Sequence, residues 1–339
     1  MSEYPTINFT GNKRKIVEWI YSSFPIKSGK VLDIFSGGGS VSYMLKSHGF
    51  EVISNDCLFA NYVISKAIIE NKEITLDKSV FDMEISQKEI ECSMNNVSFL
   101  SSRLYFDYEL PELARLICIS NKLQDYEKYI FLALLRRAMI RKLPYSRMNV
   151  KWEKIAQLRD EDYSYRMYGR RRAYHNESFT KHMIDGLEDY NQSIFDNGKV
   201  CYAVNEDVLS IAHKIDFVDA VYLDPPYPGT TNDYESFYGP FGEMFGYSQN
   251  IKTDFTSKDT FCDHLKELLD ALRHKTNYYV MSINTVVKPA PETIIELLKQ
   301  YGSVSVLEKN HNYQLTGKEN KTSNKELLLI VTLDHSIHS

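Results

Sequence analysis

Short apolar runs and longer periodic segments alternate within the first 70 residues of this sequence. The run KVLDIF is followed by the glycine-rich stretch SGGGS, by the segment VSYMLKSHGF and by a second apolar run, EVISND. Short apolar runs bounded by turn residues are typical of buried strands, whereas a longer periodic segment is typical of a helix. The pattern predicts a strand, a turn, a helix and a second strand, in that order.

The same alternation returns after about residue 199. The runs KVCYAVNED, DAVYLD, NYYVMSIN and KELLLIVTL have the composition of strands. Among them, TSKDTFCDHLKELLDALRHK predicts an amphipathic helix that begins with a capping box of Thr256 and Asp259. Strands that alternate with helices predict a largely parallel α/β sheet. The apolar face of the predicted helix consists of Phe261, Leu265, Leu268, Leu269 and Leu272.

The section between these two regions has a different pattern. Helical segments such as DYEKYIFLALLRRAMIRKL predominate there, and no further buried-strand run occurs. A chain of 339 residues is long enough for about two domains. We therefore expect a discontinuous α/β catalytic domain, residues 1–70 and 195–339, interrupted by a mainly helical domain, residues 71–194.

Composition narrows the protein class. The apolar run YIFLALL ends at Arg136, far short of the ~20 residues that a membrane span needs, and the first residues lack the apolar core of a signal peptide. The five cysteines are scattered, with no Cys-x-x-Cys pair, which gives no support to a disulfide framework or a zinc cluster. We expect a cytoplasmic protein that has no membrane partner and no metal.

Charge is distributed unevenly. The net charge is −5, but residues 136–181 contain 13 Lys and Arg against 5 Asp and Glu, a local balance of +8 that leaves −13 for the rest. Tyrosines and Trp152 are interleaved with these cations, a combination that suits phosphate contact and base stacking. The alternative is an ordinary solvated face, but the run GRRR at 169–172 in an acidic protein favours DNA.

The glycine-rich turn is the first candidate binding site. Gly37 and Gly39 lie between a predicted strand that ends near Asp33 and a predicted helix, where backbone can approach a nucleotide-like cofactor and helical N–H groups are free. Asp56 follows the next strand, 17 residues after Gly39, close to the ~20-residue offset of a ribose-binding carboxylate. A plain tight turn with a strand-end cap is the alternative, and Phe35 fits either a cofactor contact or the core.

The second candidate site is Asp224-Pro225-Pro226-Tyr227, which follows the apolar run AVYL. Proline cannot continue a strand ladder, so the motif ends the strand abruptly. Together with DIFSGGGSVS, SND, NEDVLSI and the final NKELLLI, in this order, the motif resembles the Dam-like adenine-N6 DNA methyltransferases, as does NFTGNKRKIVEWI near the start. An ordinary turn initiated by aspartate is the alternative for the motif alone.

The resemblance implies a Rossmann-like methyltransferase sheet, mostly parallel with an antiparallel C-terminal strand, and an inserted helical target-recognition domain. It also implies S-adenosylmethionine as the cofactor, with Lys13 and either Tyr4 or Asn8 at its methionine end and Asp207 at its adenine. A surface lysine and a strand-end cap are the alternatives for Lys13 and Asp207.

The expected chemistry follows from the poor nucleophilicity of an adenine amine. Asp224 and a main-chain carbonyl of Pro225–Pro226 would accept its N–H groups, while Tyr227 would stack on the base, which must be flipped out of the duplex. Proximity then supplies much of the rate without a metal. Cytosine-N4 or RNA methylation, and an inactive DNA-binding relative, are the alternative functions.

The expected partner is double-stranded DNA, and the sequence leaves open whether a cognate restriction endonuclease exists. The residues that we expect to contact DNA are Arg147, Arg170, Arg171, Arg172 and, in the tyrosine-rich stretch GTTNDYESFYGPF, Tyr234.

Overall fold

The computed structural model describes residues 3–228, 233–247, 253–310 and 325–334. Its contacts divide the chain into two compact units. An α/β unit comprises Gly11–Cys57, Asn197–Asp233 and Asn250–Ser339, and a helical unit comprises Met1–Thr10, Leu58–Asp196 and Tyr234–Gln249. The helical unit is therefore larger than the insert at residues 71–194 that we expected.

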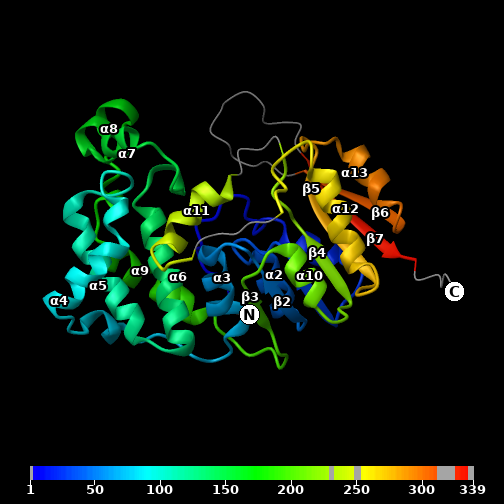
Figure 1. The fold of residues 1–339 in the computed structure, drawn as a ribbon, viewed down its shortest axis with the longest axis horizontal. Coiled ribbons are helices and arrows are strands. Elements are labelled where there is room, and N and C mark those ends of the chain that lie inside the picture. Colours follow the sequence, from blue (N-terminus) through cyan, green and yellow to red (C-terminus); the bar gives the residue numbers. More distant parts are fainter. Residues whose placement is uncertain (1–2, 229–232, 248–252, 311–324, 335–339) are drawn as a thin grey trace. The chain divides into compact units, whose positions relative to one another are not determined.

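The α/β unit is built on a seven-stranded sheet in the order β3-β2-β1-β4-β5-β7-β6 (Figure 1). The pairs β1 with β2, β2 with β3, β1 with β4 and β4 with β5 are parallel, whereas β7 runs antiparallel to both β5 and β6. The predicted fold class, a mostly parallel sheet with an antiparallel C-terminal strand, is confirmed. The strands are β1 (Lys30–Asp33), β2 (Glu51–Asn55), β3 (Tyr202–Val204), β4 (Ala220–Leu223), β5 (Tyr278–Asn284), β6 (Gly302–Asn310) and β7 (Lys325–Leu333).

Helices α10, α12 and α13 pack on one face of this sheet. Successive strand side chains point to opposite faces, and alternate residues such as Leu32, Val221 and Met281 share a buried cluster with Ile211, Leu265 and Ile294 from the three helices. Figure 1 shows α10 and α12 lying along β4. The helices of this unit are α1 (Val17–Ser23), α2 (Ser40–Ser47), α10 (Val208–Lys214), α12 (Phe261–Leu272) and α13 (Pro291–Leu298).

Two local predictions in this unit differ from the structure. The expected capping box is wrong, because α12 begins only at Phe261 after a turn, and the backbone and hydroxyl of Thr256 instead donate to Asp254. Strand β6 was not predicted. It is mostly exposed along its length, so its sequence GSVSVLEKN has no run of buried apolar residues.

The helical unit has α6 (Asp125–Arg141) at its centre, which packs against α3, α5 and α9. Helix α3 lies in the range that we assigned to the catalytic domain, but its apolar residues pack on α6 and α11. Within the described residues, no helix is long and apolar enough to cross a membrane. The other α-helices are α3 (Phe59–Ser65), α4 (Gln87–Ser93), α5 (Leu110–Lys122), α7 (Trp152–Arg159), α8 (Glu161–Tyr168), α9 (Phe179–Gln192) and α11 (Tyr234–Glu243). A π-helical turn spans Lys66–Glu70, and 3₁₀ turns span Lys78–Asp82, Met94–Asn96, Ser98–Leu100, Asp107–Glu109, Pro144–Ser146 and Ala173–His175.

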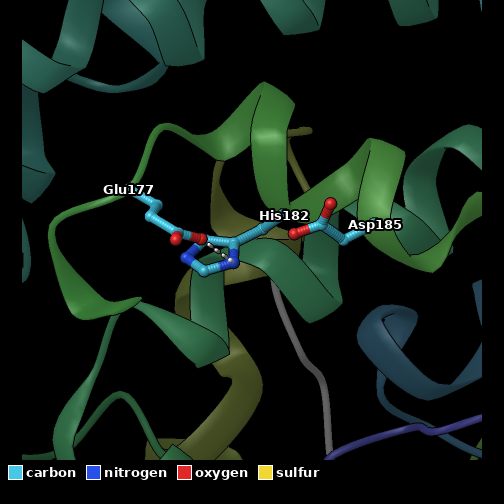
Figure 2. Close-up of side chains that lie close together, drawn as sticks. All are labelled: Glu177, His182 and Asp185. Carbon is cyan, nitrogen blue, oxygen red and sulfur yellow. Dashed lines mark ion pairs between the residues drawn. The ribbon is translucent and has the colours of Figure 1, made fainter. Parts of the chain in front are cut away.

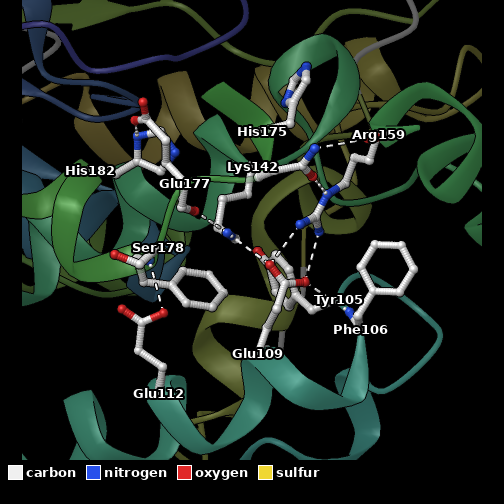
Figure 3. A network of polar contacts seen from close by, with 12 residues as sticks. Tyr105, Phe106, Glu109, Glu112, Lys142, Arg159, His175, Glu177, Ser178 and His182 are labelled. Atoms are coloured by element: carbon white, nitrogen blue, oxygen red, sulfur yellow. Dashed lines mark hydrogen bonds and ion pairs between the residues drawn. The ribbon is translucent and has the colours of Figure 1, made fainter. Parts of the chain in front are cut away.

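A buried ionic network joins three of these helices (Figure 3). Glu109, just before α5, accepts two hydrogen bonds of 2.8 and 2.7 Å from Arg159 at the end of α7, and its carboxylate lies 2.8 Å from the Lys142 ammonium after α6. Burial alone would raise the pKa of Glu109, but the hydrogen bonds and charges of Arg159 and Lys142 outweigh it and hold that pKa below its usual value. These two cations are therefore part of the core rather than of the surface.

Candidate active site

The carboxyl ends of β1, β2 and β4 meet at one edge of the sheet, because these strands are parallel neighbours. Asp33 ends β1, Asp56 follows β2 and Asp224 follows β4. The structure therefore collects at one edge the acidic residues that the sequence places far apart. Of the predicted site residues, the α/β unit contains Lys13, Asp33, Phe35, Gly37, Gly39, Asp56, Asp207, Asp224, Pro225, Pro226 and Tyr227, and the helical unit contains Tyr4, Asn8, Arg147, Arg170, Arg171, Arg172 and Tyr234.

The glycine turn has the conformation that its sequence requires. Gly37 and Gly39 have φ values of 53° and 78°, a region that costs glycine little, and Gly39 is the N-cap of α2. The Gly37 N–H donates to the Asp56 carboxylate over 2.8 Å. Asp56 is thus held against the turn, close to the start of α2.

Asp33 is a buried carboxyl group beside this turn. Its Oδ2 accepts a 2.6 Å hydrogen bond from the Ser42 hydroxyl on α2, whereas its buried Oδ1 has no hydrogen-bond partner among the described residues. Burial raises the pKa of Asp33 to about 7, the Ser42 hydrogen bond opposes the rise, and the charges of Asp224 and Asp56 add to it. Asp33 therefore offers an unused acceptor to a cationic or N–H group.

Asn55 supports this edge and was not predicted. It is fully buried, and its amide donates to the carbonyl oxygens of Ile34 and Glu206, both over 3.1 Å, while its oxygen accepts from the Glu206 N–H. One side chain thus ties together the segments that follow β1 and β3. The only sequence signal was a polar residue at the end of the apolar run EVIS.

Two predicted cofactor residues have structural contacts of their own. Asp207 is the N-cap of α10, accepting from the Leu209 N–H over 3.1 Å, and it also accepts from the Thr253 hydroxyl over 3.2 Å. Phe35 is half-buried and packs edge-on against Phe255, with ring centroids 5.1 Å apart. Cofactor contact stays a prediction for both.

The Asp-Pro-Pro-Tyr motif is tightly organised. The Tyr227 hydroxyl donates to Asp224 Oδ1 over 2.9 Å, and the Tyr227 residue is only 5% exposed, in the cluster that includes Phe261. We expected Tyr227 to offer a face for stacking on the base. In the structure its ring is buried and its hydroxyl contacts Asp224, and stacking on a base stays a prediction.

Lys13 lies at Asp224. Its ammonium is 3.2 Å from Asp224 Oδ1 and 2.8 Å from Oε1 of the buried Glu326 on β7. Burial raises the pKa of Asp224, Lys13 opposes this, and the charge of Glu326 reinforces it. We expected Lys13 at the methionine end of a cofactor, and the structure gives it two carboxylate partners within the protein.

The predicted DNA-contacting residues form two groups in the helical unit. After α8, the guanidinium groups of Arg171 and Arg172 lie over the rings of Tyr165 and Tyr168, at 5.4 and 5.2 Å from the ring centroids, and both tyrosines are exposed. Arg170 is exposed beside them.

The second group surrounds the start of α11. Arg147 lies over the Phe237 ring at 5.1 Å, and Tyr234 stacks on Phe9 with ring centroids 5.4 Å apart. Residues 229–232 of the tyrosine-rich stretch lie outside the described residues.

The charge count of residues 136–181 overstated the cationic surface. Four of its 13 basic residues are buried, and Arg171 forms an ion pair of 3.2 Å with Asp162. The remaining cations are the ones available to phosphates. The four buried residues are Arg136, Arg137, Lys142 and Arg159.

One group of side chains in the described part of the chain has the spacing of metal ligands: Glu177, His182 and Asp185 (Figure 2). Both ring nitrogens of His182 are already used, because Nδ1 accepts from Arg141 over 3.2 Å and Nε2 donates to the Tyr174 carbonyl over 2.7 Å. Burial lowers the pKa of His182 to about 4, and Asp185 pairs with Lys181. The group is an ordinary polar cluster.

Known proteins with similar sequences indicate the family to which this chain is related. A family model described as D12 class N6 adenine-specific DNA methyltransferase matches residues 9–314. The chain is 41% identical over 333 residues to the type II methyltransferase M2.HphI of Haemophilus parahaemolyticus, covering 97% of this chain and 98% of that protein.

Two longer relatives are more distant. The modification methylase StsI of Streptococcus sanguinis is 23% identical over 329 residues, 87% of this chain and 46% of its own length. The type II methyltransferase M.FokI of Planomicrobium okeanokoites is 24% identical over 306 residues, 80% of this chain and 43% of its own length. This chain thus spans less than half of each of these two proteins.

Proposed function

The chain belongs to the D12 class N6 adenine-specific DNA methyltransferase family, and from this premise we propose that Asp224 receives the target amine while the glycine turn holds the cofactor. The observation that carries the proposal is the position of Asp224, directly after β4, on the strand next to the one that leads into the glycine turn. Donor and acceptor of the methyl group would then meet at one edge of the sheet.

The proposed cofactor is S-adenosylmethionine, which supplies a methyl group already activated on a sulfonium. The unused Oδ1 of Asp33 suits a cationic or N–H group, and the Asp56 carboxylate suits ribose hydroxyls beside the positive-φ turn of Gly37 and Gly39. These residues fit the cofactor in chemistry, with carboxylate acceptors and a turn in which no Cβ obstructs the backbone.

Asp224 would act on the amine of the target adenine. The lone pair of that amine is delocalised into the ring, and an acceptor for its N–H group increases electron density on nitrogen. The motif is rigid, because two prolines fix the backbone after Asp224 and Tyr227 binds the carboxylate. Most of the rate advantage would then come from alignment of the amine with the methyl group.

The helical unit would hold the DNA. Its arginines after α8, of which Arg170 and Arg171 are exposed, suit phosphates, and the neighbouring tyrosines suit stacking on bases or sugars. An adenine inside a duplex cannot reach the sheet edge, so the enzyme would flip it out, at a cost of about a few kcal/mol.

A role in a restriction-modification system is the biological setting that we propose. The names of the relatives describe a type II methyltransferase, a modification methylase and a second type II methyltransferase. Methylation by this chain would then protect DNA from a cognate endonuclease that cuts the same sequence.

The test is methyl transfer in vitro. The purified protein is incubated with S-adenosylmethionine carrying a labelled methyl group and with mixed-sequence duplex DNA, and modified bases are mapped by modification-sensitive sequencing. We expect N6-methyladenine within one short sequence. Label on cytosine, label on RNA in preference to DNA, or no transfer would contradict the proposal.

A further inference from the structure

Glu326 is a buried charged residue near the start of β7, directly before the apolar run at residues 327–331. It is fully buried on β7, the antiparallel strand inserted between β5 and β6. Its Oε1 accepts a 2.6 Å hydrogen bond from the Ser282 hydroxyl on β5 and lies 2.8 Å from the Lys13 ammonium. A buried carboxylate is costly unless it is paired, and a buried ion pair is often no more stabilising than apolar residues of the same volume. Stability alone therefore gives a weak reason for this charge.

The ion pair of Glu326 and Lys13 is linked to the candidate active site through Asp224. Lys13 also contacts Asp224, and it does so on Oδ1, the same oxygen that accepts from the Tyr227 hydroxyl. Both contacts of the Asp224 carboxylate within the described part of the chain, from Lys13 and from Tyr227, therefore fall on Oδ1 rather than on Oδ2. The described residues thus distinguish the two oxygens of Asp224, because the contacts from Lys13 and Tyr227 are both made to Oδ1.

We propose that Glu326 is a positioning residue, which holds Lys13 against Asp224 Oδ1 and thereby leaves Oδ2 oriented to accept the N–H of the target amine. The inference rests on the proposed function, since it concerns the same acceptor. A carboxylate bound through one oxygen cannot rotate freely about its Cβ–Cγ bond. Without Glu326, the flexible Lys13 side chain has one carboxylate fewer to fix it.

The charges of Lys13 and Glu326 also affect the pKa of Asp224, which can be measured separately from the position of its oxygens. The titratable or charged side chains that interact with Asp224 are Lys13, Asp33, Tyr222, Tyr227 and Glu326. Lys13 favours the ionised form of Asp224, whereas Glu326 disfavours it. Removal of either partner should slow the reaction, yet the two removals should move the titration of Asp224 in opposite directions.

The experiment compares Glu326→Gln with Lys13→Met and with a matched control, Glu308→Gln. Glu308 lies on β6 and pairs with Lys325 over 2.7 Å, but both side chains are about half-exposed. For Glu326→Gln we expect kcat to fall about tenfold or more, with KM for cofactor and DNA changed by less than about threefold. The acid limb of its kcat–pH profile should move to lower pH, and that of Lys13→Met to higher pH. The control should match the wild type.

Each outcome decides a different question. Wild-type protein that transfers no methyl group to DNA adenine overturns the proposed function and this inference with it. Wild-type activity together with an unchanged kcat and acid limb in Glu326→Gln overturns the inference alone, as does a shift in the same direction for both variants. If Glu326→Gln does not fold, Ser282→Ala removes only the hydroxyl that fixes Oε1, and it should show a smaller fall in kcat without a change in KM. Unchanged kinetics in Ser282→Ala would then count against the positioning role.

Discussion

Asp33 and Asp224 lie at one sheet edge with different surroundings: Asp33 is buried, whereas the Asp224 side chain is 20% exposed. Asp33 has a single hydroxyl donor, and burial raises its pKa to about 7, whereas Asp224 has an ammonium and a phenol on one oxygen. A cation nearby favours the ionised form of an acid more than a neutral hydroxyl does. Lys13 therefore favours the ionised form of Asp224, which can accept a hydrogen bond. Asp33 has no such cation beside it, and we expect a bound ligand to supply the positive charge.

Replacement of Asp224 tests its role as acceptor. We expect Asp224→Ala to lower kcat by about 10²–10³-fold, the usual cost of losing one polar group aligned with a transition state. Cofactor affinity should stay close to that of the wild type, since Asp33, Asp56 and the glycine turn are untouched. Single-turnover methyl transfer and calorimetric cofactor titration measure the two quantities. Asp216→Ala, an exposed position in the same unit, is the control, and near-normal turnover of Asp224→Ala would refute the assignment.

Replacement of Asp33 should raise the free energy of unfolding and lower the affinity for the cofactor. A pKa of about 7 in the fold against 3.8 unfolded means that the folded state binds more protons, so stability is lost as pH rises from about 4 to about 7. Asp33→Asn keeps an acceptor for Ser42 and removes the buried charge. We expect it to raise the free energy of unfolding at pH 8 by on the order of 3 kcal/mol and by less at pH 5. Cofactor affinity should fall.

Urea denaturation at the two pH values and calorimetry measure these changes. A stability gain that is equal at pH 5 and pH 8, or larger at pH 5, would mean that Asp33 does not titrate as its burial indicates.

The residues whose place at the sheet edge could be predicted from the sequence are those that directly follow a recognisable strand. Asp56 and Asp224 follow recognisable strands, and parallel strands bring their carboxyl ends together. Glu326 and Asn55 could not be assigned this way, because their roles depend on pairings between distant strands. Nothing near residue 326 indicates Lys13 as its partner, and the burial of Tyr227 follows from α12 packing rather than from its motif.

Among the helices and strands, the apolar pattern predicted most of the buried strands and the partly exposed β3, but it missed the mostly exposed β6. Helix α12 and strands β1, β2, β4, β5 and β7 have clear apolar patterns, whereas β6 lies mostly exposed. The start of α12 was misjudged because Thr256 bonds Asp254 locally, in a turn that competes with a helix cap. Helix α3 falls within the range 1–70 that we expected in the catalytic domain but clusters with the helical unit, since an apolar pattern does not specify which neighbour buries it.

The segment after α8 is the element whose function is simplest to test. If Arg170, Arg171 and Arg172 meet phosphates, a triple Arg→Ala variant should bind duplex DNA more weakly at low salt, whatever its sequence. The log–log dependence of affinity on salt should flatten by about 0.9 for each phosphate that an arginine no longer neutralises. Anisotropy titrations across a salt range measure both effects.

A charge-matched control removes three exposed lysines of the α/β unit, Lys214, Lys266 and Lys299. Equal decreases in affinity for the two triple variants would mean that net charge, rather than this segment, sets the affinity. A decrease in discrimination between sequences of about 1–3 kcal/mol in the arginine variant would instead mean that one arginine reads a base edge.

For the chain as a whole, base flipping predicts that a weakened base pair improves binding. A mismatch opposite the target adenine removes part of the cost of unpairing, so affinity should rise by about 10- to 100-fold over the matched duplex. The same mismatch two base pairs outside the recognition sequence is the control. Equal affinity for matched and target-mismatched duplexes would indicate that the adenine is not extruded in the bound complex.

Strand β7 pairs between β5 and the edge strand β6, and it places Glu326 beside Lys13. The partners of this ion pair are made at opposite stages of protein synthesis, since residue 13 leaves the ribosome long before residue 326. A nascent chain could form β1 to β5 and the glycine turn. Lys13 would then have Asp224 as a partner, but it would lack Glu326 until β7 pairs with β5. Ribosome-stalled chains that end before Lys325 should therefore be poor catalysts even where they bind cofactor, so that efficient methylation begins only after Glu326 has been added to the chain.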